Sequence, residues 1–75
     1  MLPAVPPSAW RPTHLVNGRG VAAWEAPDPS TPTAAQLAPW TEVQVLLQEG
    51  EWANVVLANG WQGWVDAGQL IRRAG

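Results

Sequence analysis

The side chains that could carry catalysis are few and scattered along the chain. His14 is the only histidine, and a histidine acts as a general base only beside a nucleophile and an orienting acid. The hydroxyl groups available as nucleophiles lie in no nucleophile motif: Ser8, Thr13, Ser30 and Thr41. Glu25, Asp28 and Asp66 would have to pair across a loop for acid–base chemistry or metal binding, whereas acidic residues in turns usually serve as caps. The sequence therefore predicts a protein without catalytic residues, cofactor or metal.

Tryptophan is the residue type that offers a binding chemistry. The chain has six tryptophans and neither phenylalanine nor tyrosine. Trp24 stands directly before a stretch that contains Pro27 and Pro29, and Trp52 begins an apolar segment. Groove aromatics stack on proline rings with little loss of entropy. We therefore expect a ligand-binding groove between the two rings and these prolines. The alternative is that the tryptophans only cover a domain too small to bury them.

Composition narrows the class of protein. A chain of 75 residues forms one small domain, and without cysteine it has neither disulfides nor thiolate metal sites. Four arginines, no lysine and six acidic residues give a net charge of −2, which argues against nucleic acid and against a polybasic membrane patch. No apolar run approaches about 20 residues and no signal peptide is visible, so membrane insertion is not expected and a cytoplasmic location is favoured.

Proline divides the chain into segments. Residues 1–12 hold four of the eight prolines and predict an extended lead-in, in which residues 3–6 form a PxxP pattern. Residues 13–71 form the expected domain, and residues 72–75 form a polar tail. Inside the domain, residues 25–33 hold three more prolines and predict a long loop, because proline is excluded from helices and central strands. Loops near this length are often functional.

Short strands with turn signals between them fill the domain. Alternating or continuous apolar runs predict strands over residues 21–24, 42–48, 52–57 and 61–66, with shorter runs at 13–16, 34–37 and 70–71. Asn59-Gly60 predicts a hairpin, Gly63 permits a close approach by another ring, and residues 67–69 predict a tight turn. Alternation places Trp24 and Trp52 on faces opposite the presumed core. We expect an all-β fold, and a barrel rather than a sandwich because a barrel leaves fewer exposed edges.

The residues from about 13 to 71 resemble the bacterial SH3-type domain, SH3b. The first strand and loop are similar to that family's V-x-A-x-x-x-P-x-P pattern at Val21, Ala23, Pro27 and Pro29. The strongest likeness is the pattern W-x-x-V-x-L-x-N-G-x-x-G-W-V over residues 52–65, followed by a short turn that ends in Leu70. Where the family often has L-N-V-R in the first strand, this chain has V-A-A-W.

The resemblance implies a small five-stranded, partly open SH3-like barrel with one 3-10 turn and the long loop over one side. It also implies a non-catalytic module that recognises a peptide or protein partner, such as a cell-wall peptide, through an aromatic groove. Asp66 resembles the position of the groove proline and Gln69 that of the groove tyrosine, so both belong to the expected site. Their identities argue for an altered groove over proline recognition.

Two alternatives to the binding of a separate ligand are open. In the first, Trp10 and the prolines beside it fold back on the chain's own groove as an internal ligand, or bind the groove of a second copy in a dimer. The other alternative is structural: the domain docks within a larger protein or self-associates through exposed tryptophan.

Overall fold

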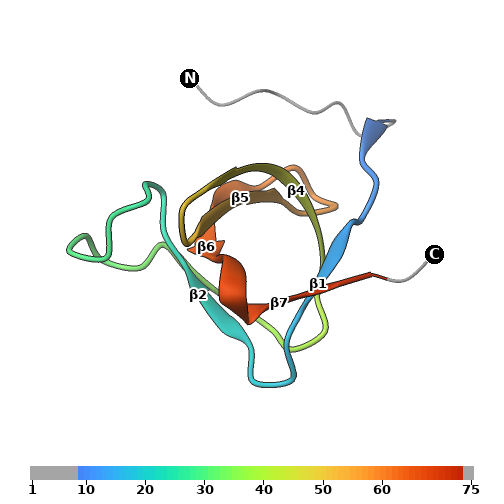
Figure 1. The fold of residues 1–75 in the computed structure, drawn as a ribbon, viewed down its shortest axis with the longest axis horizontal. Coiled ribbons are helices and arrows are strands. Elements are labelled where there is room, and N and C mark those ends of the chain that lie inside the picture. Colours follow the sequence, from blue (N-terminus) through green and yellow to red (C-terminus); the bar gives the residue numbers. More distant parts are fainter. Residues whose placement is uncertain (1–8, 74–75) are drawn as a thin grey trace.

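The computed structural model describes residues 9–73, which form two antiparallel sheets and one 3-10 turn (Figure 1). In chain order the elements are β1 (His14–Val16), β2 (Val21–Ala23), β3 (Ala35–Leu37), β4 (Glu42–Glu49), β5 (Trp52–Val56), β6 (Gln62–Asp66), η2 (Ala67–Gln69) and β7 (Leu70–Arg72). Each expected strand is present, with ends shifted by one residue. Within residues 9–73 no helix is long and apolar enough to cross a membrane.

Five of the strands make one sheet, in the order β6-β5-β4-β1-β7, and β2 and β3 pair with each other. The two sheets meet where Trp24, directly after β2, bridges to Trp64 in β6 through backbone hydrogen bonds of 2.8 and 2.7 Å. The described strands do not close into a barrel. The expected all-β fold is therefore confirmed, but in place of a barrel the described residues form a five-stranded sheet with a two-stranded hairpin bridged to its edge.

The largest cluster of buried side chains lies on one face of this sheet and is aliphatic within the described residues. In β2 and β5 the residues that were predicted to face the core do point inward, because side chains alternate between the two faces of a strand. The cluster is made of aliphatic side chains: Val16, Val21, Ala23, Leu37, Val43, Ala53, Val55 and Val65. Trp61 packs against this cluster from its edge, over Gly63. An alanine Cβ at Gly63 would lie 2.6 Å from Cζ3 of Trp61, so the close ring approach expected there is confirmed.

A second buried layer lies on the opposite face of β5 and β6, which the sequence did not predict. Asn54 and Val56 are 0% and 1% exposed, and Trp64, which pairs with Asn54 across the strands, is 5% exposed. Trp10 reaches this face and donates its indole N–H to the carbonyl of Val56 at 2.9 Å. Both faces of β5 are therefore covered, and Trp52 at its start is the half-buried residue of the strand.

The loop between β2 and β3 projects from one side of the molecule (Figure 1). Its proline-rich sequence forms bends instead of strand, as expected, and all residues from Glu25 to Ala34 are exposed. The hairpin after β5 is closed by a hydrogen bond of 2.9 Å from the amide of Leu57 to the carbonyl of Trp61, with Gly60 at a φ of 90°. Only glycine adopts that angle at little cost, which explains the Asn-Gly signal.

Candidate functional site

Two tryptophans from distant parts of the chain meet at the base of the projecting loop. The ring centroids of Trp24 and Trp52 are 5.3 Å apart, and the ring planes are 89° to each other. This edge-to-face arrangement places the positive edge of one ring against the negative face of the other and stabilises the pair by about 0.5–1.5 kcal/mol beyond burial. Both rings are half-buried, so each keeps part of its surface in solvent.

Trp24 is held from its backbone and from its indole nitrogen. The bridge to Trp64 fixes the backbone, and the indole N–H donates to the carbonyl of Thr31 at 3.0 Å. The loop is in turn folded around Asp28, whose Oδ1 accepts from the amide and the hydroxyl of Ser30 at 2.9 and 2.7 Å. These hydrogen bonds from Ser30 lower the pKa of Asp28. The loop therefore forms an ordered support for the ring.

Trp52 is flanked by carboxylates on the neighbouring strands. It pairs directly with Asp66 of β6 and with Glu49 of β4, and opposite residues in antiparallel strands share one face of the sheet. Asp66 also caps η2, because its Oδ1 accepts from the amide of Gly68 at 2.9 Å. The ring thus stands in an acidic row that the strand register imposes.

The two rings open onto a hollow of about 270 Å³. It is lined by Trp24, Pro29, Glu51, Trp52 and Asp66. Four of the six residues predicted for the binding site therefore come together here. Glu51 was missed, although its position between the turn glycine and Trp52 was a usable signal, because a residue next to a groove ring lies within reach of the same ligand.

The other two predicted residues lie away from this hollow. Pro27 is exposed in the loop but does not line the hollow. Gln69 joins η2 to the turn after β1: its Oε1 accepts from Nδ2 of Asn17 at 2.6 Å, and its carbonyl accepts from the Asn17 amide at 3.1 Å. The 3-10 turn changes the direction of the chain between Asp66 and Gln69. The two side chains therefore lie on different parts of the surface.

Asn54 is a buried polar residue beneath the site that the sequence did not single out. It lies on the same face of β5 as Trp52, is 0% exposed, and donates from Nδ2 to the carbonyl of Gly63 at 3.0 Å. Its Oδ1 has no hydrogen-bond partner within the described part of the chain. The side-chain bond ties β5 to β6 directly behind the tryptophan pair, at the cost of one unsatisfied acceptor.

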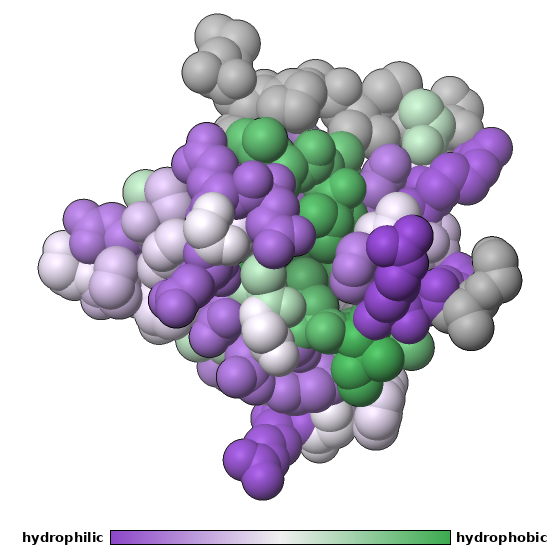
Figure 2. Space-filling model, viewed as in Figure 1, coloured by the Kyte–Doolittle hydropathy of each residue, from purple (hydrophilic) through white to green (hydrophobic). Residues whose placement is uncertain are grey.

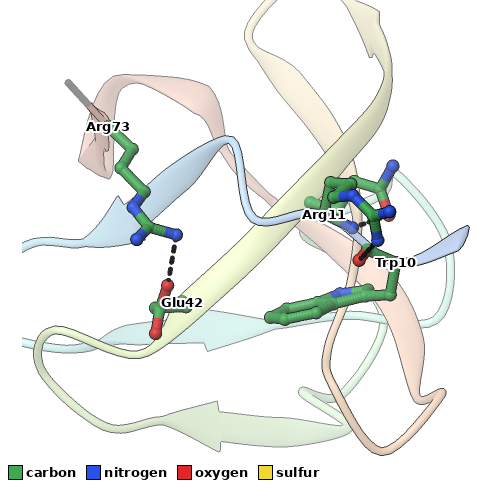
Figure 3. A network of polar contacts seen from close by, with 5 residues as sticks. Trp10, Arg11, Glu42 and Arg73 are labelled. Carbon is green, nitrogen blue, oxygen red and sulfur yellow. Dashed lines mark hydrogen bonds and ion pairs between the residues drawn. The ribbon is translucent and has the colours of Figure 1, made fainter. Parts of the chain in front are cut away.

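Trp10 does not enter the hollow between Trp24 and Trp52. It lines a different hollow of about 450 Å³ that also contains Trp40, Leu57 and Asn59. The main chain beside it is held to β4, since the amide of Arg11 donates to Oε1 of Gln44 at 3.2 Å (Figure 3). For residues 9–12 the expected internal-ligand role is therefore not observed. Residues 1–8, with the PxxP pattern, lie outside the described residues.

His14 lies at a third hollow, lined also by Thr13, Val45 and Arg72. Its Nδ1 is 2.9 Å from Oγ1 of Thr13, and that oxygen also accepts from the amide of Val45 at 2.9 Å. Burial, and secondarily the charge of Arg72, lower the pKa of His14. The Thr13 hydroxyl thus links the residue before β1 to the amide of Val45 in β4.

The hollow at Trp24 and Trp52 is the described site that unites the most predicted residues. It contains two rings, one proline and two carboxylates, which are groups that can stack on a ligand and accept hydrogen bonds from it. Comparison with protein-family models, with curated proteins and with solved structures finds no match for this chain.

Proposed function

We propose that this chain is a non-catalytic, SH3-like binding module that recognises a peptide or protein partner through the hollow between Trp24 and Trp52. The observation that carries the proposal is the edge-to-face pair of half-buried rings, 5.3 Å apart, that opens onto a hollow rimmed by the proline-rich loop. Hot spots of protein interfaces are enriched in tryptophan, and they lie in pockets that lose their water when the partner binds.

The order of the elements supports the SH3-like part of the proposal. A long loop separates the paired strands β2 and β3, the strands β4, β5 and β6 follow as a meander, and η2 precedes a last strand that pairs with β1. The resemblance noted in residues 52–65 covers the β5–β6 hairpin of this arrangement.

Preorganisation supports the binding role. The indole of Trp24 is hydrogen-bonded to the loop at Thr31, and Trp52 is packed edge-to-face against it. Side chains that are already ordered in the free protein lose less entropy when a partner binds, which leaves more of the contact energy as affinity. A ligand segment with an extended backbone stacks on such rings without rearranging them.

Selection from a random-sequence peptide library tests the proposal without assuming a ligand, with cell-wall peptides as a separate arm. We expect selected peptides to shift the indole N–H resonances of Trp24 and Trp52, and Trp52→Ala to weaken binding at least about tenfold. Trp40→Ala is the matched control, since Trp40 is 59% exposed and lines the other hollow. Binders that shift only Trp10 and Trp40, or no binders at all, would contradict the proposal.

A docking role is the second candidate, favoured by apolar side chains left on the surface. Trp40, Leu47 and Ile71 are 59%, 40% and 43% exposed, and an apolar strip crosses one face of the molecule (Figure 2). Self-association through these side chains predicts a mass that rises with concentration in sedimentation experiments. A monomer at about 100 μM would exclude that version of the role, since stable dimers assemble well below this concentration.

A further inference from the structure

The hollow at His14 carries positive charge. It has a volume of about 480 Å³ and lies where β1 is paired with β4 and β7 (Figure 1). Two guanidinium groups and the imidazole line it together with apolar and hydroxyl-bearing residues: Pro12, Thr13, His14, Val45, Arg72 and Arg73. No acidic side chain of residues 9–73 is part of this lining. The hollow is therefore positive, although the chain as a whole has a net charge of −2.

The strand register brings the basic groups together. His14 and Arg72 are directly opposite each other in β1 and β7, and opposite residues of antiparallel strands share one face of the sheet. Like charges in such a pair destabilise the sheet. Burial, and secondarily the charge of Arg72, lower the pKa of His14, which shows that the two groups interact. The free protein thus holds a charge arrangement that a bound anion would stabilise.

Arg72 and His14 keep donors for a ligand. Arg72 forms no ion pair within residues 9–73. His14 uses Nδ1 for its contact with Thr13, and its Nε2 has no hydrogen-bond partner in the same part of the chain. Arg73 contributes less, because its Nη1 already donates to Glu42 at 2.7 Å (Figure 3). The site is therefore centred on Arg72 and His14.

We propose that this hollow is a second binding site, which takes the terminal carboxylate of a peptide together with the apolar side chain of its last residue. A guanidinium group presents a rigid fork of donors that matches the two oxygens of a carboxylate, and Arg72 supplies that fork. Both ring nitrogens of a protonated histidine donate, so Nε2 of His14 adds a third donor in that state. The site is separate from the hollow between Trp24 and Trp52.

The apolar part of the lining distinguishes this ligand from a free oxyanion. Pro12 and Val45 give the hollow an apolar wall, and an aliphatic side chain gains free energy by leaving water against such a wall, whereas phosphate does not. The volume of about 480 Å³ falls within the roughly 300–1,000 Å³ of a typical small-ligand site. One terminal residue with its carboxylate therefore suits the hollow better than an inorganic anion.

Two forms of one small compound test the proposal on the full chain: N-acetyl-alanyl-leucine with a free carboxylate, and the same compound as its C-terminal amide. NMR titration follows the ring of His14, the Nε–H of Arg72 and the methyl groups of Val45. We expect the acid to shift all three and the amide to bind at least about tenfold more weakly. Inorganic phosphate is the third probe, and it should bind more weakly than the acid and leave the Val45 methyl groups unshifted.

The protonation of His14 gives a second readout. The charged side chains next to it on the neighbouring strands are Arg72, Arg73 and Glu42, of which the last two are paired with each other. A carboxylate beside the ring favours its charged form, so the acid should raise the pKa of His14. By linkage the acid should bind several-fold more tightly at about pH 5.5 than at about pH 7.5. His14→Gln should remove this dependence on pH.

Arginine variants localise the effect. Arg72→Gln removes the fork and should lower the affinity for the acid about tenfold, with an unchanged amide spectrum away from the hollow. Arg19→Gln is the matched control, because it removes the same charge from the turn after β1 and does not line the hollow. Equal binding of acid and amide, an equal loss in the two variants, or phosphate that binds as tightly as the acid would overturn the proposal. Shifts at Trp24 and Trp52 in place of His14 would overturn it as well, and would leave the binding module intact.

Discussion

Two tryptophan pairs occupy different regions of this small domain, and their surroundings differ. Trp24 and Trp52 pack edge-to-face, are half-buried, and stand among carboxylates that form no ion pair in the described part of the chain. Trp10 and Trp40 line a second hollow, where one indole is bonded to the carbonyl of Val56 and the other ring is 59% exposed. Beside this second hollow, Glu42 is already paired with Arg73.

This difference is the reason why we place the proposed recognition site at the first pair. At the first pair, the loop holds the indole of Trp24 and the strand register places Asp66 beside Trp52, so both rings are held in the free protein. At the second, Trp10 covers the sheet and Trp40 lies on a left-handed backbone with a φ of 65°, stacked over Gly18. The proposed recognition site therefore lies at the first pair, whereas Trp10 is bound to the strand β5 through its indole nitrogen.

The largest effect is expected at Gly63, which lies behind the first pair. A Cβ there would lie 2.6 Å from Cζ3 of Trp61 and 3.0 Å from the carbonyl of Trp24, and backbone cannot move aside easily. We expect Gly63→Ala to lower the free energy of unfolding by about 2–3 kcal/mol, the cost of overpacking, in urea denaturation. Indole shifts at Trp24 and Trp52 should exceed those at Trp40. A stable variant whose shifts are confined to Trp40 would reverse the comparison.

A smaller loss is expected when Trp10 is removed. Trp10→Ala deletes the hydrogen bond to the Val56 carbonyl and uncovers that face of β5, so we expect a loss of about 1–2 kcal/mol in the same denaturation experiment. Trp10→Phe keeps a ring and loses the hydrogen-bond donor. Its free energy of unfolding should therefore lie between that of the parent and that of Trp10→Ala. Neither variant should alter binding of library peptides at Trp52. Weakened binding would mean that Trp10 belongs to the recognition site.

Replacement of Trp40 is expected to be nearly neutral. Asparagine tolerates a positive φ better than tryptophan, which offsets the loss of a ring that is already mostly exposed. We expect Trp40→Asn to leave the free energy of unfolding within about 0.5 kcal/mol of the parent. A melting curve and the Trp10 indole resonance provide the measurement. A loss as large as that of Trp10→Ala would show that both rings of the second hollow are structural.

The smallest effect on stability is expected from a change of pH, through His14, which belongs to neither tryptophan pair. Burial and Arg72 lower the pKa of His14, so the unfolded chain binds its proton more readily than the folded one. Its contribution to stability is present above the ordinary value of 6.5 and is lost as pH falls from there through the folded pKa. Urea denaturation from about pH 7.5 to about pH 5 measures this slope, and His14→Gln should flatten it. The lowered pKa of Asp28 acts below its ordinary value of 3.8 and does not enter that window.

Much of the strand layout was predictable because local signals and burial agree there. Alternation in residues 21–24 and 52–55 predicted the core face correctly, and Asn59-Gly60 marked the hairpin. The predicted site was recovered in part: Trp24, Pro29, Trp52 and Asp66 meet, whereas Pro27 and Gln69 do not line the hollow. Alternation does not say what covers the second face of a strand, so the burial of Asn54 and Val56 was not foreseen.

The residue pattern by itself determined the strands, the proline-rich loop, the hairpin turn and the outward phase of Trp24 and Trp52, because each depends on neighbours within a few positions. Tertiary structure alone decided that the two rings touch, that Glu51 joins them, and that Trp10 lies at a separate hollow. Those contacts join residues far apart in the chain, 46 positions in the case of Trp10 and Val56. They depend on the register of β5 with β6 and on the bridge between Trp24 and Trp64, which local periodicity does not encode.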